Sequence, residues 1–320
     1  MYEEEMEEIV DKALFRIFGL EVTPYALFIV LGAVLALILA LRRAKRIGVT
    51  QDAVLLFAML AIPLGLILGR AVFCACRIVD VYDFGFSYVF KLIYGGYSIM
   101  GVFGGVLLAA FLTKKIGYTA FTDVLDAVMP GLLIMLALAR FGEGSTMNGT
   151  GPEVTVPALQ FMPLARRGMY GEYTYAVYMG EALTALIAGV YTQCMDRRPR
   201  GEVAGTGLII VCAGQALWEA LRRDQVLKFD FMRWVMVVSG LVLLGILLLS
   251  LRRLDWPMGG KILTVAGLFL MAGVVMAMEF FADGKLIQTI PVWACYLCEA
   301  IGVCGMGALC LKTLRAACEV

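Results

Sequence analysis

Residues 94–154 decide the fold, and they read YGGYSIMGVFGGVLLAAFLTKKIGY (94–118) followed by TAFTDVLDAVMPGLLIMLALARFGEGSTMNGTGPEV (119–154). Two apolar segments flank a short basic loop, and the second carries Arg140 near its far end. An ionised side chain in an apolar span is costly, so it normally faces the interior of a helix bundle with a partner or a ligand. The stretch also holds glycines that let backbones or lipid headgroups approach closely: Gly95, Gly96, Gly101, Gly104 and Gly105. It therefore predicts a polar site inside a membrane.

The composition is typical of a membrane protein, with 61% hydrophobic residues, 17% charged residues and a mean hydropathy of +0.86. A net charge of +1 argues against a nucleic-acid partner, because no basic face could be assembled outside the loops. The chain contains no histidine, which excludes imidazole as a base, an acid or a metal ligand. We therefore expect no metal and no cofactor. The nine cysteines lie mostly in apolar spans and indicate small buried side chains.

Nine segments are apolar enough to cross a bilayer, for which a helix needs about 20 residues. They lie at residues 24–41, 53–74, 98–113, 121–140, 176–194, 205–221, 231–251, 261–281 and 290–311. The sequence therefore predicts an all-α, polytopic membrane protein of about nine transmembrane helices. Lys and Arg favour the odd-numbered connections, which predicts that the N-terminus is outside and the C-terminus inside. The sixth connection is the exception, because it holds Arg222, Arg223, Lys228 and Arg233 on the outer side.

The first 23 residues are too acidic for a signal peptide. Apolar residues recur there at helical spacing, namely Met6, Val10, Ala13, Leu14 and Ile17. This spacing predicts an amphipathic helix on the membrane surface over residues 1–23. The alternative is a frayed tail.

The sixth span carries a polar stripe, because Gln215, Glu219 and Arg222 stand at i, i+4 and i+7 on one helix face. The stripe would form one pocket near the outer leaflet with three charged residues of the fourth and fifth spans: Arg140, Glu143 and Glu181. Guanidinium groups suit phosphate, so the pocket predicts an anionic phospholipid headgroup as its ligand. The alternative is a set of structural ion pairs, such as Arg140 with Glu143.

A series of short motifs runs along residues 24–252. Tyr25 precedes an apolar span that ends in RRAKRIG (42–48), and Gly69-Arg70 and GGYSIMGVFGG (95–105) follow. The later motif positions are Asp126, Pro130, Arg140, Gly142, Glu181, Glu219, Arg222 and Asp224. In this order the pieces resemble those of the prolipoprotein diacylglyceryl transferase family. The resemblance covers seven spans and leaves residues 253–320 as a two-helix extension.

The resemblance implies an enzyme of the bacterial cytoplasmic membrane. It would move diacylglyceryl from phosphatidylglycerol onto the cysteine thiol of a lipoprotein precursor peptide. Three motif positions depart from the family pattern: Met100 stands where the family has His, Gln215 where it has Arg, and Glu143 where it has Asn, although Asn148 follows. The residues that we expect to bind substrate are Arg140, Arg222, Arg70, Tyr97, Ser98, Met100, Gln215, Asn148 and Glu181.

Three functions fit these residues. The first is a transferase of this kind with altered or reduced chemistry, in which Arg140 and Arg222 hold the donor phosphate and Glu219 or Glu143 is the catalytic base. The second is a non-catalytic paralogue that binds anionic phospholipid, which the missing His favours. The third is a transporter, which is disfavoured because we find no strong inverted repeat and no paired broken helices.

Two expectations concern placement. Arg140, Glu219 and Arg222 should line one outward-facing cavity, with Tyr97, Ser98 and Met100 at its wall. Since Glu219 can balance only one of the two guanidinium groups, a lipid phosphate would balance the other. We also expect the last two spans to be peripheral to this site.

Overall fold

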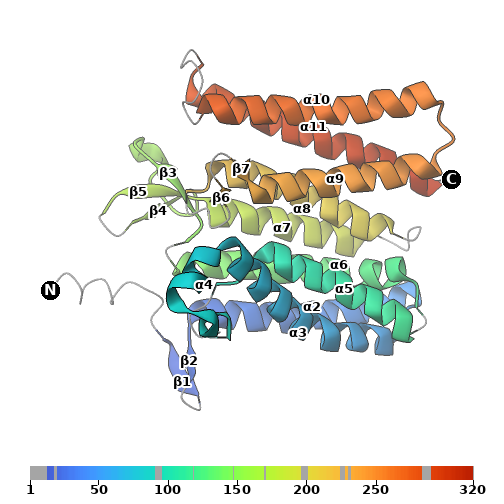
Figure 1. Ribbon diagram of the computed structural model, residues 1–320, viewed down its shortest axis with the longest axis horizontal. Helices are drawn as coiled ribbons and strands as arrows, with labels where there is room; N and C mark the ends of the chain where they lie inside the picture. The colour runs from blue at the N-terminus through green and yellow to red at the C-terminus, as the bar shows by residue number, and fades with distance from the viewer. Residues whose placement is uncertain are drawn as a thin grey trace. The chain divides into compact units, whose positions relative to one another are not determined.

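The structure is a computed structural model, and it describes residues 13–17, 20–90, 96–117, 119–146, 148–168, 171–195, 201–223, 228–229, 232–282 and 290–319. Long helices dominate the described residues (Figure 1). They are α2 (Pro24–Ile47), α3 (Gln51–Cys76), α5 (Ile99–Gly117), α6 (Phe121–Gly142), α7 (Val177–Cys194), α8 (Glu202–Leu221), α9 (Trp234–Arg253), α10 (Met258–Ala282) and α11 (Val292–Glu319). Each predicted span corresponds to one of them.

Eight of these helices, all except α7, are long and apolar enough to cross a membrane. The prediction of an all-α, polytopic membrane protein is therefore confirmed. Helix α7 has 18 residues and includes polar side chains, among them Glu181 and Thr192, which are both buried. A helix that buries charge belongs inside a bundle, where other helices cover its polar groups.

The chain forms two compact units, and the first comprises residues Leu37–Met129. Its helices α3 and α5 pack tightly, because a Cβ atom at Gly101 or Gly105 would collide with the backbone of α3. Arg43, buried near the end of α2, donates a hydrogen bond from Nε to the carbonyl oxygen of Asp126 at 2.8 Å. This bond ties α2 to the first part of α6. The short helices α4 (Ile78–Phe84) and η1 (Phe86–Phe90) follow α3.

The second unit comprises Met1–Ala36 and Pro130–Val320. The first part of α2 packs on the last part of α6, with Gly131 against the backbone of Ala36 and Gly142 against the ring of Phe28. Helix α8 contacts α7, α9 and α11, while α10 lies beside α11 (Figure 1). The buried core of these helices includes Ile209, Leu243, Leu247, Leu268, Val275, Val303 and Met306.

Short strands and 3-10 turns connect the helices. The strands are β1 (Phe15–Ile17), β2 (Leu20–Val22), β3 (Thr150–Glu153), β4 (Ala165–Arg167), β5 (Tyr173–Ala176), β6 (Lys228–Phe229) and β7 (Met232–Arg233). They form two antiparallel hairpins, β1–β2 and β6–β7, and one sheet of order β3-β5-β4. The turns η3 (Glu143–Ser145) and η4 (Pro157–Leu159) flank β3.

The hairpin β1–β2 corrects the prediction of a surface helix over residues 1–23. Phe15 pairs with Val22 and Ile17 with Leu20, so the described part of this segment is extended. Three-residue strands alternate their side chains between two faces, and so short a segment can also match a helical spacing by chance. Residues 1–12, which include Met6 and Val10, lie outside the described residues.

The last two helices contribute more to this unit than the sequence predicts. Leu268 and Val275 of α10 and Val303 and Met306 of α11 belong to the same buried core as Leu243 of α9. The predicted boundary at residue 252 therefore separates segments that share one hydrophobic core. The division into residues 24–252 and 253–320 stays a prediction about which part of the chain resembles the family, and it does not describe how the helices pack.

Candidate functional site

Four charged residues of the second unit meet where three helices end or begin. Arg140 lies in the last turn of α6, Glu143 in η3, Glu181 in the first turns of α7, and Arg222 directly after α8. We call these four residues the quartet. Gly142 lets α6 end against α2, because a Cβ atom there would lie 2.8 Å from Phe28 Cβ.

Glu143 joins both arginines of the quartet. Nη1 of Arg140 donates to Oε1 and Oε2 of Glu143 at 3.0 and 2.8 Å, and Nη2 of Arg222 donates to Oε1 at 3.0 Å. Only 14% of the Glu143 side chain is exposed. Charge-assisted hydrogen bonds of this length are the strong ones, so Glu143 is held firmly between the two guanidinium groups.

Glu181 joins the same two arginines from α7, and its side chain is fully buried. Nη1 of Arg222 donates to Oε2 of Glu181 at 2.9 Å. Nε of Arg140 lies 3.2 Å from the same oxygen, as an ion pair without hydrogen-bond geometry. Oε1 of Glu181 is buried and has no hydrogen-bond partner among the described residues. The quartet is therefore a closed arrangement of two cations and two anions.

This charge balance differs from the one expected from the sequence. We expected Glu219 to balance one guanidinium group and a phosphate to balance the other. Instead, Glu143 and Glu181 each contact both arginines, so the quartet is neutral without a ligand. The physical reason is that a carboxylate has two oxygens and can bridge two guanidinium groups at once. The ion pair of Arg140 with Glu143, expected under the structural alternative, is present.

Two residues of the polar stripe on α8 lie beside the quartet. Gln215 accepts a hydrogen bond from Nη2 of Arg140 at 3.2 Å. Glu219 is buried, with 6% of the residue exposed, and lies within electrostatic range of Arg140, Glu181 and Arg222. The stripe therefore faces the polar interior of the unit, as its spacing predicts.

An ion pair that was not predicted from the sequence, between Arg233 and Glu279, extends this region. Arg233, 8% exposed, donates from Nη1 to the carbonyl oxygen of Glu219 at 2.6 Å. Its Nη2 lies 2.5 Å from Oε1 of Glu279 in α10. Arg233 had been counted as a loop charge. An acidic residue inside an apolar span, such as Glu279, is a signal that could have found this pair.

Arg70 has a different environment in the first unit. Its guanidinium group donates to three backbone carbonyl oxygens, those of Tyr88 at 2.6 Å, Gly96 at 3.1 Å and Val89 at 3.2 Å. It also lies over the rings of Phe73 and Tyr88. These contacts hold the segment after α3 in place, and the predicted substrate contact of Arg70 stays a prediction.

The other predicted substrate contacts are not brought together with the quartet by any described interaction. Tyr97 is 38% exposed and Ser98 is buried, and both belong with Met100 to the first unit. The side chain of Asn148 is exposed, next to Gly149, whose carbonyl oxygen accepts a hydrogen bond from the backbone of Tyr178. The roles of these residues stay predictions.

Comparisons with known proteins agree with the motif order. A model of the prolipoprotein diacylglyceryl transferase family matches residues 12–251. The chain is 31% identical over 255 residues to the phosphatidylglycerol–prolipoprotein diacylglyceryl transferase of Halalkalibacterium halodurans. This alignment covers 77% of this chain and 87% of that protein. It is 30% identical over 254 residues to the protein of that name from Streptococcus suis, with 76% and 93% covered. For Oceanobacillus iheyensis the identity is 26%, with 76% and 88% covered.

Proposed function

The chain belongs to the prolipoprotein diacylglyceryl transferase family, and from this premise we propose that it transfers diacylglyceryl from an anionic phospholipid to a protein cysteine. The donor is phosphatidylglycerol, and the acceptor is the thiol of a lipoprotein precursor peptide, as the relatives' names state for those proteins. The observation that carries the proposal is the quartet, because it contains two arginines, whose guanidinium groups suit phosphate, in the polar interior of a membrane protein.

The reaction exchanges one bond at a glycerol carbon of the donor lipid. The cysteine sulfur attacks this carbon, an S–C bond forms, and the C–O bond to the phosphate breaks. The leaving group is glycerol phosphate, and the thiol proton goes to a base of the protein. Catalysis therefore needs a cation at the departing phosphate and a carboxylate near the sulfur.

Arg140 and Arg222 are the proposed phosphate ligands. Because Glu143 and Glu181 already contact both guanidinium groups, the donor phosphate would replace one of these carboxylates as the partner of at least one guanidinium group. Arg222 is suited to such an exchange, since it lies just beyond the end of α8 in extended backbone. The carboxylates would hold the two guanidinium groups in position until the lipid arrives.

Glu219 is the proposed base. Of the two predicted candidates, Glu143 accepts hydrogen bonds from both quartet arginines, and a carboxylate held in this way is a poor proton acceptor. Glu219 is buried on the same side of α8 as Gln215, one turn before Arg222. It is thus within reach of the region where the phosphate would lie, without being part of the quartet.

A non-catalytic paralogue that binds phosphatidylglycerol is the second candidate. One observation favours it: Met100 occupies the motif position where the family has His, and the chain has no histidine at all. Binding would then use the same arginines, and only turnover would be lost.

Transfer to a peptide separates these candidates. We would incubate the purified full-length protein with labelled phosphatidylglycerol and a lipobox peptide, and measure peptide lipidation by mass spectrometry. The transferase proposal expects lipidation that falls by about 100-fold or more in Glu219→Gln, the scale of a lost general base. Glu153→Gln, which changes an exposed carboxylate on β3, is the matched control and should keep full activity. Bound phosphatidylglycerol without any lipidation by the wild-type protein would support the paralogue instead.

The membrane orientation is proposed on the loop charges alone. We place the protein in the bacterial cytoplasmic membrane with its N-terminus outside and its C-terminus inside. Cysteine labelling at the exposed position Lys45 and at the C-terminus should report the same cytoplasmic side, and opposite sides would contradict the proposed count of spans.

A further inference from the structure

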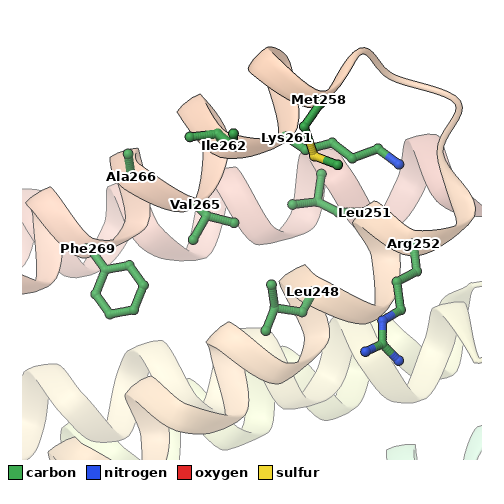
Figure 2. Close-up of a pocket in the computed structure, with 9 residues that line it drawn as sticks. All are labelled: Leu248, Leu251, Arg252, Met258, Lys261, Ile262, Val265, Ala266 and Phe269. Atoms are coloured by element: carbon green, nitrogen blue, oxygen red, sulfur yellow. The ribbon is translucent and has the colours of Figure 1, made fainter.

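A second candidate site, lined by both charged and apolar side chains, lies in the cavity between α9 and α10, far from the quartet. Figure 2 shows its lining side chains: Leu248 and Leu251 of α9 face residues from Met258 to Phe269 of α10, and Arg252 also lines the cavity, with its guanidinium group directed away from Lys261. The cavity volume is about 590 Å³. It exists because α10 packs mainly on α11 and touches α9 only lightly. We call it the α9–α10 groove.

The two ends of the groove differ in chemistry. Arg252 and Lys261 lie at the end near the α9–α10 connection, and Phe269 lies at the other end (Figure 2). Between them the walls are apolar side chains such as Leu248, Ile262 and Val265. A charged end that opens into an apolar channel matches the shape of a lipid, which has an anionic headgroup and hydrocarbon chains.

The backbone at the charged end favours an anion as well. Lys261 lies in the first turn of α10, where unpaired backbone N–H groups and the helix dipole attract negative charge. Arg252 ends α9 and is exposed. Only four residues join the two helices, so both cations stay at the same membrane surface. Basic pockets between membrane helices at this depth bind anionic phospholipid headgroups.

We propose that the α9–α10 groove binds one anionic phospholipid, with its phosphate at Arg252 and Lys261 and an acyl chain along Ile262, Val265 and Phe269. This lipid is not the donor of the proposed reaction. Helix α9 starts next to Arg233, which contacts Glu219, and it ends with Arg252 and Arg253. Twenty residues of helix span about 30 Å, so the groove cations and the quartet lie near opposite membrane surfaces.

The groove also depends on residues beyond the family match. Met258, Lys261 and the apolar wall of α10 all lie after residue 251, where that match ends. The site is therefore a property of this chain's C-terminal extension. It gives α10 a role at the membrane surface in addition to its contribution to the core.

Photo-crosslinking tests the proposal directly. We would place the full-length protein in nanodiscs that contain phosphatidylglycerol with a diazirine in one acyl chain, and map labelled peptides by mass spectrometry. Labelling should concentrate on residues 248–269 and fall at least fivefold in Arg252→Gln/Lys261→Gln. Arg253→Gln is the matched control, because Arg253 is an exposed neighbour that does not line the groove, and it should change labelling less than twofold. Ala266→Trp, which fills the groove, should also reduce labelling at least fivefold.

Three results would overturn the proposal. The first is equal labelling of residues 248–269 by diazirine phosphatidylcholine, since a zwitterionic lipid does not need the cations. The second is unchanged labelling in Arg252→Gln/Lys261→Gln or in Ala266→Trp. The third is complete loss of labelling in the presence of about 10 mM glycerol phosphate, since a site that binds the free headgroup does not need the apolar wall. Peptide lipidation is a separate readout, so failure here leaves the proposed transferase activity unaffected.

Discussion

Arg70 of the first unit is buried and Arg140 and Arg222 of the quartet are mostly buried, but the three guanidinium groups have different partners. The quartet arginines contact carboxylates, so their charge is cancelled. The printed contacts of Arg70 are instead three backbone carbonyl oxygens and two aromatic rings. Both environments satisfy the N–H donors of a guanidinium group. Burial of an arginine therefore does not by itself indicate a ligand site, and the type of partner decides the expected effect of a substitution.

Removing one quartet carboxylate should have the largest effect. Glu181→Gln leaves two buried guanidinium groups with one bridging carboxylate, and the free energy of unfolding should fall by about 3–5 kcal/mol, as for other broken buried pairs. Thermal unfolding in detergent would measure this. Glu181→Gln/Arg140→Gln restores neutrality and should recover at least about 1 kcal/mol. A double variant no more stable than Glu181→Gln would contradict the charge-balance account.

Arg70→Lys should lower the free energy of unfolding by less, and a second substitution that changes the charge nearby should not restore the loss. Lysine keeps the cation but loses the planar fork that reaches three carbonyl oxygens, so we expect a loss of about 2 kcal/mol. Limited proteolysis of the segment after α3 should become faster. The control is Arg77→Lys, since the ion pair of Arg77 with Asp80 is exposed and should contribute less than about 0.5 kcal/mol. Equal losses in both variants would argue against the carbonyl contacts of Arg70.

Gly96→Ala tests the same environment from the backbone side. Gly96 has a φ of 79°, and a Cβ atom there would lie 2.7 Å from Cζ of Phe73 and 2.9 Å from Nη1 of Arg70. Positive φ alone costs a non-glycine residue about 1–2 kcal/mol, which is the minimum loss that we expect in thermal unfolding. Gly104→Ala is the opposite case: it lies inside α5 with open space around it, and it should stabilise by about 0.5–1 kcal/mol. A neutral Gly96→Ala would show that the segment can relax.

Gln215 should give the smallest effect among these sites. Gln215→Leu removes one acceptor from Arg140, whose charge is still met by two carboxylates, so the loss should be about 1 kcal/mol. Gln215→Arg should destabilise more, because it adds a third guanidinium group next to a neutral quartet. If Gln215→Arg were instead the more stable of the two, the added guanidinium group would have to pair with Glu219, one turn further along α8.

The sequence predicted the helices well and their polar contacts less completely. Hydropathy located the nine helices because a membrane span needs a long apolar run, and this signal is local. The strands β1 to β7 have two to four residues each, too few for an alternating pattern to stand out. The spacing of Gln215, Glu219 and Arg222 predicted a shared face. The partners of Arg140 depended on how α6, α7 and α8 are arranged, which no local pattern encodes.

The charge balance of the quartet could not be predicted from the sequence, for a specific reason. Glu143 was considered a candidate base or a simple i, i+3 partner of Arg140, and Glu181 a substrate contact. Their ability to bridge two arginines each appears only when α7 and the end of α8 lie together. The three carbonyl contacts of Arg70 were also not predicted, because a motif position does not reveal which backbone groups surround a side chain.

The ion pair between Arg233 and Glu279 has a consequence for how this protein can vary. Arg233 lies within the family match and Glu279 lies beyond it, so the pair couples the shared part of the chain to its own extension. Replacing residues 253–320 by an unrelated sequence would therefore remove this ion pair. A natural variant that ends near residue 251 would lack the Glu279 carboxylate, so we expect the side chain at the position of Arg233 to vary among such sequences. Covariation between positions 233 and 279 would support this dependence. Chimeras in which α10 is exchanged should show the same dependence.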